Sequence, residues 1–381
     1  MTNELLGLVL ALPGHAFLWI GLVNRLHSIG AKRRIIKRFT LAFFLAALTI
    51  PILIGVCQRC AALGGLVGGY VVLCWIIAPA TLLRLVYFRW FRLRTPEIVR
   101  SCVKRPAAID VRAAAVGEAE NRHHFLVGMP GNEILRLELR DWVIDVPRLP
   151  AALEGLSIVH LSDFHFTGRV GKAYFREVVR TSNELRPDIV ALTGDIIDAR
   201  ECFDWIADAL GRLTAAHGVF CILGNHDLRV GDIDRVRRSL ERSGLIYLGN
   251  QEREIRVEGC SVLLAGNERP WINGPDGEKL ASTDHDGDAL RIVLSHSPDQ
   301  LGWARAWNAD LMLAGHTHGG QIRIPPLGAI FSPCADGVKY VSGVYYEPPT
   351  ILHVSRGVSG DIPVRWNCRP EISRLRLRCP R

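Results

Sequence analysis

The amino-acid sequence predicts an α/β fold with two β-sheets, preceded by a small bundle of membrane-spanning helices. Three features support this prediction. The first quarter of the 381-residue chain contains three long apolar segments. Between residues 157 and 248, apolar β-branched runs alternate with helical patterns, which is typical of a parallel sheet. After residue 252, short apolar runs follow one another with little helix between them, and they predict a second, more antiparallel sheet.

The three apolar segments have 19, 18 and 23 residues without Asp, Glu, Lys or Arg, about the length that crosses a bilayer. They are Leu5–Val23, Phe39–Val56 and Ala61–Leu83. A cleaved signal peptide would need a basic start, whereas the one early charge is Glu4. Buried soluble helices would need a polar face at helical spacing, which the second and third segments lack. We therefore expect three spans.

The basic character of the chain is confined to its N-terminal region. Residues 1–105 hold 14 Lys or Arg against 2 Asp or Glu, and the remaining residues hold 32 against 36. Because loops rich in Lys and Arg stay in the cytoplasm, we expect a multi-pass protein of a bacterial inner membrane with its C-terminal part on the cytoplasmic side. That part is net negative and has no basic and aromatic stripe, so we expect no nucleic-acid partner.

Two features of the membrane region leave alternatives open. Cys57 and Cys60 form a Cys-x-x-Cys pair in the outer loop, which is either a disulfide or two unconnected thiols. Leu83–Arg94 mixes arginine with aromatic residues, and it either binds anionic lipid or only fixes the topology. The expected domains are a transmembrane region (1–94), a linker (95–130) and a C-terminal domain (131–381).

The C-terminal domain is expected to begin with a strand in Ile134–Val146, where apolar and charged residues alternate as on a strand with one wet face. Buried strands and helices then follow in turn. They are expected at 157–161 (strand), 172–185 (helix), 189–192 (strand), 202–216 (helix), 219–223 (strand), 232–243 (helix) and 246–248 (strand).

The sequence of the second half of this domain predicts mostly strands. Within it, Gly266–Asp288 is rich in Gly, Asp, Asn and Pro, and we expect a surface insertion that either contacts substrate or is a solvated loop. The expected strands are 252–258, 260–265, 289–294, 311–314, 321–324, 339–346, 350–354 and 372–377.

Five of the expected strands share one feature: each apolar run ends at a small residue followed by Asp, Asn or His. The carboxyl ends of strands are where open α/β sheets build their sites. If these carboxylate, amide and imidazole groups converge, they form a metal site. The five blocks are Asp163-x-His165, Gly194-Asp195-x-x-Asp198, Gly224-Asn225-His226-Asp227, Ser295-His296 and Gly315-His316-Thr317-His318.

These five blocks, in this order, resemble the signature of the calcineurin-like metallophosphoesterases. The resemblance spans residues 163–318 and implies a four-layer α/β/β/α sandwich that holds two metal ions at its strand ends. It also implies that Asp195 bridges both ions. The other implied ligands are Asp163, His165 and His318 for the first ion, and Asn225, His296 and His316 for the second.

The mixed ligand set favours manganese, with iron or zinc as alternatives, over magnesium, which prefers oxygen ligands. Two such ions activate water and neutralise the phosphoryl oxygens during in-line displacement. The resemblance implies that His226 faces the substrate and protonates the leaving oxygen or stabilises the transition state, while Asp198 fixes its ring. Asp227 either supports the neighbouring ligands or caps the following helix.

The chain is also similar to the membrane-anchored bacterial branch of this family. That branch includes phosphodiesterases and a UDP-2,3-diacylglucosamine pyrophosphatase, so the resemblance implies hydrolysis of a phosphodiester or pyrophosphate bond. Membrane anchoring suggests membrane lipids as partners and a lipid-linked phosphate as substrate. The stretches that carry the similarity are Gly319-Gly320-Gln321, 150–156, 355–358 and 363–372.

Two alternative functions stay open. One is a soluble-nucleotide phosphodiesterase, and the other is a metal-binding scaffold of the same fold without turnover. A scaffold is expected to have lost ligands, whereas all seven ligand positions are filled in this sequence.

Overall fold

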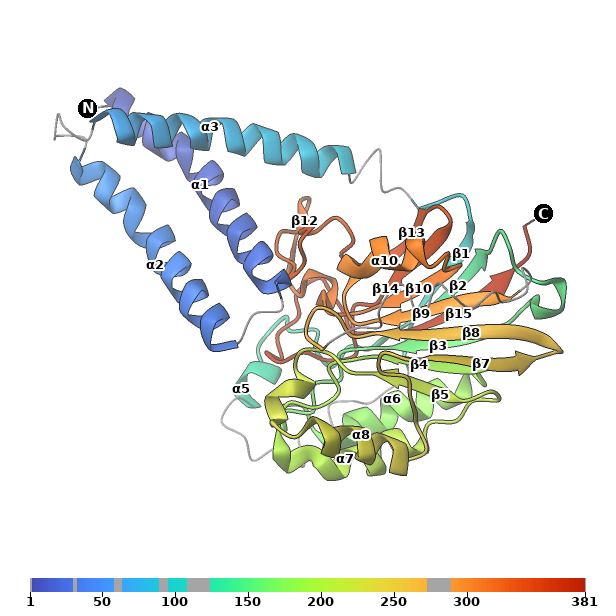
Figure 1. The fold of residues 1–381 in the computed structure, drawn as a ribbon. Coiled ribbons are helices and arrows are strands. Elements are labelled where there is room, and N and C mark those ends of the chain that lie inside the picture. The colour runs from blue at the N-terminus through green and yellow to red at the C-terminus, as the bar shows by residue number, and fades with distance from the viewer. Residues whose placement is uncertain are drawn as a thin grey trace. The chain divides into compact units, whose positions relative to one another are not determined.

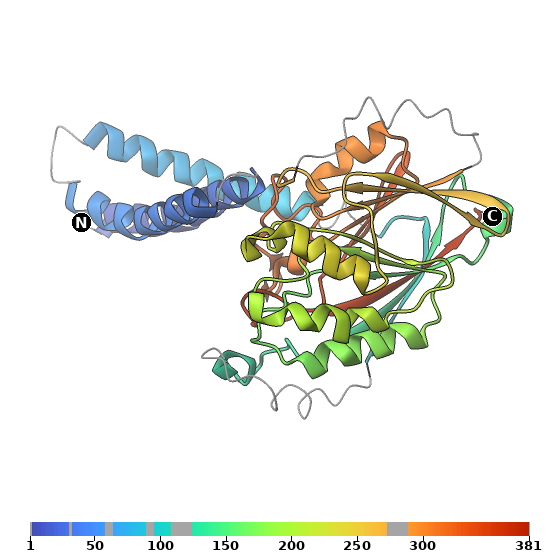
Figure 2. The same cartoon turned by 60° about the horizontal axis from the view of Figure 1, so that its bottom comes forward.

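In the computed structural model, the chain forms two compact units (Figures 1 and 2). The first is Met1–Arg94 with Pro333–Lys339, and the second is Thr95–Ser332 with Tyr340–Arg381. Cys60 and most of the expected insertion lie outside the described residues, so the predictions made for them are untested. The structure describes residues 2–29, 33–57, 64–88, 95–107, 124–272 and 289–380.

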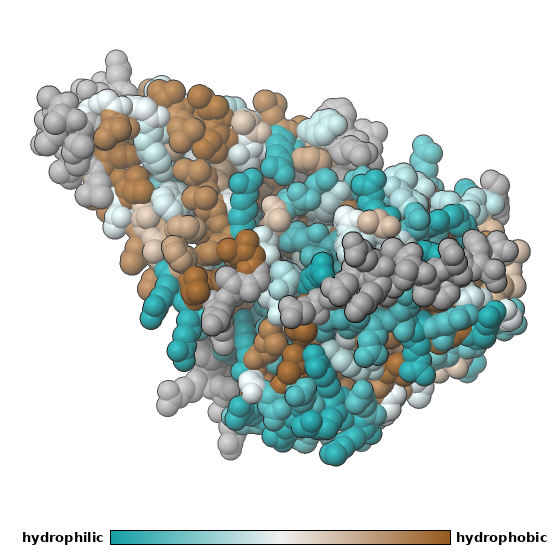
Figure 3. All heavy atoms as spheres, in the orientation of Figure 1, coloured by the Kyte–Doolittle hydropathy of each residue, from teal (hydrophilic) through white to brown (hydrophobic). Residues whose placement is uncertain are grey.

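The first unit contains the helices α1 (Thr2–Ser28), α2 (Arg33–Cys57) and α3 (Gly64–Tyr87). Within the described residues, these three are the helices long and apolar enough to cross a membrane. Their surface is largely apolar in the space-filling view (Figure 3). The prediction of three long apolar helices is therefore confirmed, and these helices suggest membrane anchoring.

Polar and small residues hold the three helices together. His15 on α1 lies 2.6 Å from the Tyr70 hydroxyl on α3 through Nδ1, and 2.7 Å from the Ala47 carbonyl on α2 through Nε2. A Cβ atom on Gly14 would overlap the Cys74 carbonyl, so α1 and α3 approach closely there. The histidine that interrupts the first apolar segment is thus a paired residue of the bundle.

The described part of the second unit contains two large mixed sheets and a short hairpin. The seven-stranded sheet has the order β1 (Val99–Pro106), β2 (Glu138–Asp145), β15 (Glu371–Arg378), β3 (Ser157–Leu161), β4 (Ile189–Thr193), β5 (Val219–Ile222) and β6 (Ile246–Tyr247). The six-stranded sheet has the order β13 (Gly343–Glu347), β14 (Thr350–Val354), β10 (Leu311–Ala314), β9 (Leu290–Ser295), β8 (Cys260–Asn267) and β7 (Glu252–Val257). The hairpin pairs β11 (Arg323–Ile324) with β12 (Gly328–Ala329).

The sheets differ from the expectation in three respects. The second sheet was expected to be more antiparallel, and it is mixed, because β8, β9, β10 and β14 run parallel to one another. The last strand, β15, lies in the first sheet between β2 and β3. The strand β1 occupies part of the stretch that we expected to be a linker, and it pairs with β2. Apolar periodicity is the same in parallel and antiparallel strands, so it does not reveal pairing partners.

The two sheets face one another across an apolar core that includes Ile158, Leu264 and Leu313. A second core lies between the seven-stranded sheet and the helices α6 (Lys172–Glu184), α7 (Phe203–Asp208) and α8 (Ile233–Arg242), which cover its outer face (Figures 1 and 2). On the opposite side, the short helix α10 (Leu301–Ala306) packs against β14. These layers confirm the predicted α/β sandwich.

A pair of buried histidines links the two sheets. His160 on β3 and His353 on β14 lie 2.8 Å apart, measured between their Nδ1 atoms. The Nε2 atom of His160 lies 2.8 Å from the Thr193 hydroxyl. Burial lowers the pKa of both rings, and that of His353 falls to about 4. The pair therefore belongs to the fold as neutral imidazoles.

Acidification is expected to destabilise the second unit through this pair. Because the pKa of His353 is about 4 in the folded state and 6.5 ordinarily, its stabilising contribution is fully present above pH 6.5 and is lost as the pH falls toward 4. We expect a smaller loss in His353→Asn, which keeps a hydrogen-bonding group that does not titrate. The measurement is the thermal midpoint of metal-free, detergent-purified protein at pH 7 and pH 5. Equal losses in both proteins would contradict the prediction.

Candidate metal centre

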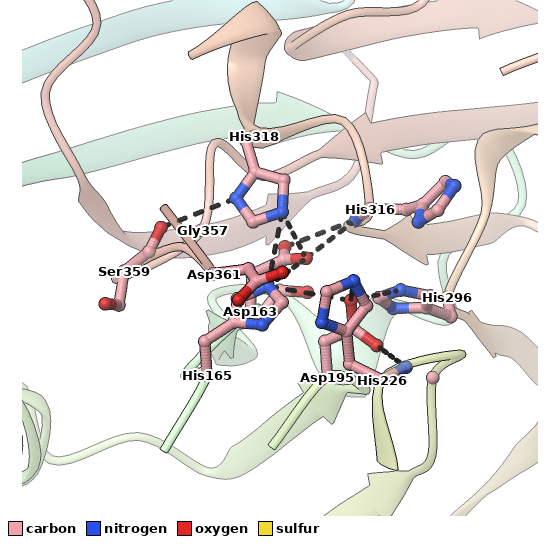
Figure 4. A network of polar contacts seen from close by, with 12 residues as sticks. Asp163, His165, Asp195, His226, His296, His316, His318, Gly357, Ser359 and Asp361 are labelled. Atoms are coloured by element: carbon pink, nitrogen blue, oxygen red, sulfur yellow. Dashed lines mark hydrogen bonds and ion pairs between the residues drawn. The ribbon is translucent and has the colours of Figure 1, made fainter. Parts of the chain in front are cut away.

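The seven expected ligands lie just beyond the carboxyl ends of strands from both sheets. Strands of the first sheet carry four of them and strands of the second sheet carry three. The side chains of the six Asp and His residues lie in one region (Figure 4). In chain order they are Asp163 and His165 after β3, Asp195 after β4, Asn225 after β5, His296 after β9, and His316 and His318 after β10.

The backbone at these strand ends is unusual. Positive φ angles are uncommon outside glycine, and they concentrate at functional sites where the surrounding structure imposes them. The turn that contains Gly224 also lies very close to Asp195, because a Cβ atom on Gly224 would overlap the Asp195 carboxylate. The sharp turns aim the side chains inward. The expected ligands with positive φ are Asp163 (55°), His165 (48°), Asp195 (53°), His316 (68°) and His318 (50°).

The first cluster of ligand atoms comes from Asp163, His165, Asp195 and His318, whose ligand atoms all lie within 4.8 Å of one another. His165 Nε2 is 3.6 Å from Asp195 Oδ2 and 3.2 Å from His318 Nε2. His318 Nε2 is in turn 3.6 Å from Asp163 Oδ1. Such spacing lets several side chains contact one ion between them.

The second cluster contains Asp195, His296 and His316, again within 4.8 Å of one another and all buried. His296 donates from Nδ1 to the Thr193 carbonyl (2.6 Å), which leaves Nε2 facing Asp195 Oδ2 at 3.1 Å. A backbone acceptor behind the ring is the usual way to orient a metal-binding histidine. Asp195 belongs to both clusters, so its carboxylate lies where a ligand shared by two ions would be.

The residues present fit a pair of divalent ions. Among the side chains of the expected ligands, three buried atoms make no hydrogen bond, namely Asp195 Oδ2, Asn225 Oδ1 and His296 Nε2, although the first and last face one another at 3.1 Å. A buried polar atom without a partner carries a free-energy cost unless a bound group satisfies it. Carboxylate, amide and imidazole donors together match a borderline divalent ion. The buried His/Asp clusters are therefore consistent with a dinuclear metal site.

The carboxylates dominate the electrostatics around two of the expected ligands, His165 and His296, whereas burial lowers the pKa of His318. Burial opposes a charge on His165, but Asp198 and Asp195 outweigh it and raise its pKa to about 9. Burial likewise opposes a charge on His296, but Asp195 outweighs it and raises the pKa of His296 to about 9. A site that attracts protons this strongly also attracts metal cations, which displace those protons on binding.

The histidine that we expected to act in catalysis lies beside both clusters. His226 Nδ1 is 2.5 Å from Asp198 Oδ1, and His226 Nε2 is 4.0 Å from Asp195 Oδ2. The other Asp198 oxygen, Oδ2, contacts His165 Nδ1 at 2.7 Å. One carboxylate thus orients an expected ligand and the expected catalytic ring together.

Asp227 supports the backbone on which the centre is built. Its Oδ1 accepts hydrogen bonds from the backbone N–H groups of Ile196 and Ile197 at 2.9 and 2.8 Å. Its Oδ2 accepts one from Gly224 N–H at 2.7 Å. These bonds join the turn after β4 to the turn after β5, so the role of supporting neighbouring ligands is favoured over that of a helix cap.

Sequence reasoning missed several residues that contact the centre from distant segments. Arg229 donates from Nη2 to His226 Nε2 (2.6 Å) and from Nη1 to Asp198 Oδ1 (2.9 Å) and Asp361 Oδ2 (2.7 Å). The buried Arg365 donates to the His318 carbonyl at 3.0 Å. The ring of Trp271 lies 4.7 Å from that of His316. Arg365 lies in the stretch 363–372, which carries the family resemblance, and Trp271 lies in the expected insertion. These two sequence features could have pointed to them.

We expect Arg229 to position the His226 ring rather than to bind metal. The variant Arg229→Ala should lower kcat for a phosphodiester by about tenfold, with KM within twofold and unchanged metal content. Steady-state kinetics and elemental analysis test this, with Arg238→Ala as the control for loss of a positive charge. A raised KM with an unchanged kcat would instead indicate direct contact with substrate.

The amino-acid sequence is similar to a known protein family and to several bacterial proteins. The family model of the calcineurin-like phosphoesterases matches residues 156–320. The uncharacterized metallophosphoesterase YkuE of Bacillus subtilis is 31% identical over 248 residues, which are 64% of this chain and 86% of YkuE. The phosphodiesterase YaeI of Escherichia coli is 32% identical over 224 residues, 58% of this chain and 81% of YaeI. The UDP-2,3-diacylglucosamine pyrophosphatase LpxG of Chlamydia muridarum is 25% identical over 300 residues, 64% of this chain and 89% of LpxG.

Proposed function

Because the chain belongs to the calcineurin-like family of metal-dependent phosphoesterases, we propose that it is a membrane-anchored hydrolase of a phosphodiester or pyrophosphate bond in a lipid-linked substrate. The observation that carries the proposal is that Asp195 belongs to two buried clusters of ligand atoms. A carboxylate between two clusters is the arrangement that a two-metal phosphohydrolase requires.

In this proposal the seven strand-end residues hold two divalent ions, with manganese favoured and iron or zinc as alternatives. Such ions, when bound, supply Lewis-acid stabilisation of the phosphoryl oxygens and lower the pKa of water. Asp195, which belongs to both clusters, would be a ligand of both ions. Asp163, His165 and His318 complete the first set, and Asn225, His296 and His316 complete the second.

In this proposal, His226 protonates the leaving oxygen. Asp198 holds its Nδ1 atom, so that Nε2 is directed toward the centre. In the present structure Arg229 donates to Nε2, so that nitrogen accepts a hydrogen bond and carries no proton. Once this contact opens and Nε2 takes up a proton from water, the ring can pass that proton to the leaving oxygen.

Two observations support a membrane-linked substrate. Three long apolar helices suggest membrane anchoring, and the headgroup of a lipid-linked phosphate is presented at a bilayer surface. Two relatives, YaeI and LpxG, are named for the cleavage of a phosphodiester and of a nucleotide-lipid pyrophosphate. The distribution of Lys and Arg supports a cytoplasmic position for the second unit in a bacterial inner membrane.

The test is hydrolysis by the full-length protein in detergent after chelation and reloading with manganese, iron or zinc. The substrates are bis(p-nitrophenyl) phosphate, p-nitrophenyl phosphate, a soluble nucleotide diester and UDP-2,3-diacylglucosamine. We expect turnover of the diester and of the nucleotide-lipid, with manganese most effective. Fast turnover of the soluble nucleotide alone would favour the nucleotide phosphodiesterase. Metal binding without turnover of any substrate would favour the non-catalytic scaffold.

A further inference from the structure

Beside the metal centre, the second unit exposes a group of apolar side chains that we call the apolar rim. Their exposed fractions lie between 37% and 57%. Scattered apolar residues on a surface are ordinary, whereas apolar residues gathered at one place mark an interaction site. The rim consists of Ile322, Ile324, Leu327, Ile362 and Trp366.

Backbone and side-chain hydrogen bonds hold the rim together although it comes from two segments. Ile322 and Trp366 form a parallel β-bridge, and Arg323 N–H donates to the Trp366 carbonyl at 2.9 Å. The Gln321 side chain donates to the Ile362 carbonyl at 2.6 Å. Leu327 and Ile324 belong to the β11–β12 hairpin. The apolar side chains are therefore placed by defined structure.

The rim borders the metal centre. The rim begins four residues after His318, and Arg365, between Ile362 and Trp366, donates to the His318 carbonyl at 3.0 Å. Asp361, directly before Ile362, accepts from Arg229 beside the expected catalytic ring. A molecule that contacts the rim therefore lies close to the ligand clusters.

Of the occupants that could cover the rim, a bilayer fits best. Five half-exposed side chains present a few hundred Å², well below the roughly 800 Å² per partner that a stable protein dimer buries. Three helices of this chain are long and apolar enough to cross a bilayer, and eleven residues separate Tyr87 of α3 from Val99 of β1. That stretch reaches at most about 40 Å when extended. Tryptophan with aliphatic residues is also the composition favoured at membrane interfaces.

We propose that the apolar rim lies in the interfacial layer of the bilayer that the chain's own helices span, so that a lipid-linked phosphate enters the metal centre from the membrane surface. The membrane contact stands independently of the reaction, whereas the entry of substrate rests on the proposed function. Apolar area buried in the interface strengthens membrane association without ion pairs.

Photocrosslinking tests the membrane contact. The full-length protein is placed in lipid nanodiscs with p-benzoylphenylalanine at position 324 or 362. The matched control carries it at Val103, an apolar residue on β1 that is also exposed and lies closer to the spans in sequence. We expect at least fivefold more lipid adduct at the rim positions. Equal adduct at Val103 would overturn the proposal.

Kinetics test the entry of substrate. The double variant Ile324→Ser with Leu327→Ser should lose at least fivefold in turnover of a lipid-linked phosphate in nanodiscs, and it should hydrolyse bis(p-nitrophenyl) phosphate at the unchanged rate. Val103→Ser should change neither rate. Equal losses on both substrates would contradict the proposal. If the unaltered protein cleaves no phosphate ester, the proposed function fails, and the crosslinking result still decides the membrane contact.

Discussion

Replacing Asp195 by alanine is expected to abolish phosphodiester hydrolysis, with a loss of kcat/KM of at least about 10³-fold, or about 4 kcal/mol of transition-state stabilisation. The reason is that Asp195 is shared by both ligand clusters, so that its removal takes one ligand from each. Its Oδ1 atom also accepts the backbone N–H of His226 at 2.7 Å, and this contact would be lost as well.

The measurement is the metal content per chain, determined by elemental analysis beside the kinetics. We expect wild-type protein to retain about two ions per chain and Asp195→Ala to retain less than one. Asp310→Asn is the matched control, because Asp310 is a buried carboxylate at the opposite end of β10 that accepts from Arg291 N–H and Arg148. That control should lose stability but keep its metal. Full activity of Asp195→Ala would contradict the assignment of the centre.

Replacing His226 by alanine is expected to lower kcat by between about 10² and 10⁴-fold without loss of metal. Its ring contacts Asp198, and these two residues form a third group of close ligand atoms with His165, but His226 belongs to neither of the clusters that share Asp195. Because a proton donor matters most when the leaving oxygen is basic, the loss should be greater for a phenyl phosphodiester than for the corresponding p-nitrophenyl ester.

The comparison of the two esters separates proton donation from charge stabilisation. An equal loss for both esters would mean that His226 stabilises the transition state without transferring a proton. His217→Ala is a suitable control, because this histidine lies just before β5, at the end of the strand remote from the centre. It should leave kcat and metal content unchanged. A loss of metal in His226→Ala would make His226 a ligand.

Local sequence was sufficient for the features that depend on neighbouring residues. Uninterrupted apolar segments of 18 to 23 residues predicted the long helices of the first unit, because crossing a bilayer requires little more than length and apolarity. Apolar runs that stop at a small residue followed by Asp or His located the strand ends. Those strand ends identified the candidate ligands, and the assembly of the two sheets then brought them together.

The features decided only by tertiary structure depend on contacts between distant residues. The pairing of β15 with β2 and β3, and the parallel course of β8, β9 and β10, result from how the sheets assemble, and side-chain periodicity carries no information on strand direction.

The same distinction applies to the site. The sequence by itself determined the types and the order of the candidate ligands, because each candidate follows its own strand and turn. Only the folded chain decided that Asp198 serves two histidines, that Arg229 and Asp361 meet beside His226, and that Ile322 pairs with Trp366. These contacts join residues from 28 to 132 positions apart, and no local pattern encodes which distant segments pack together.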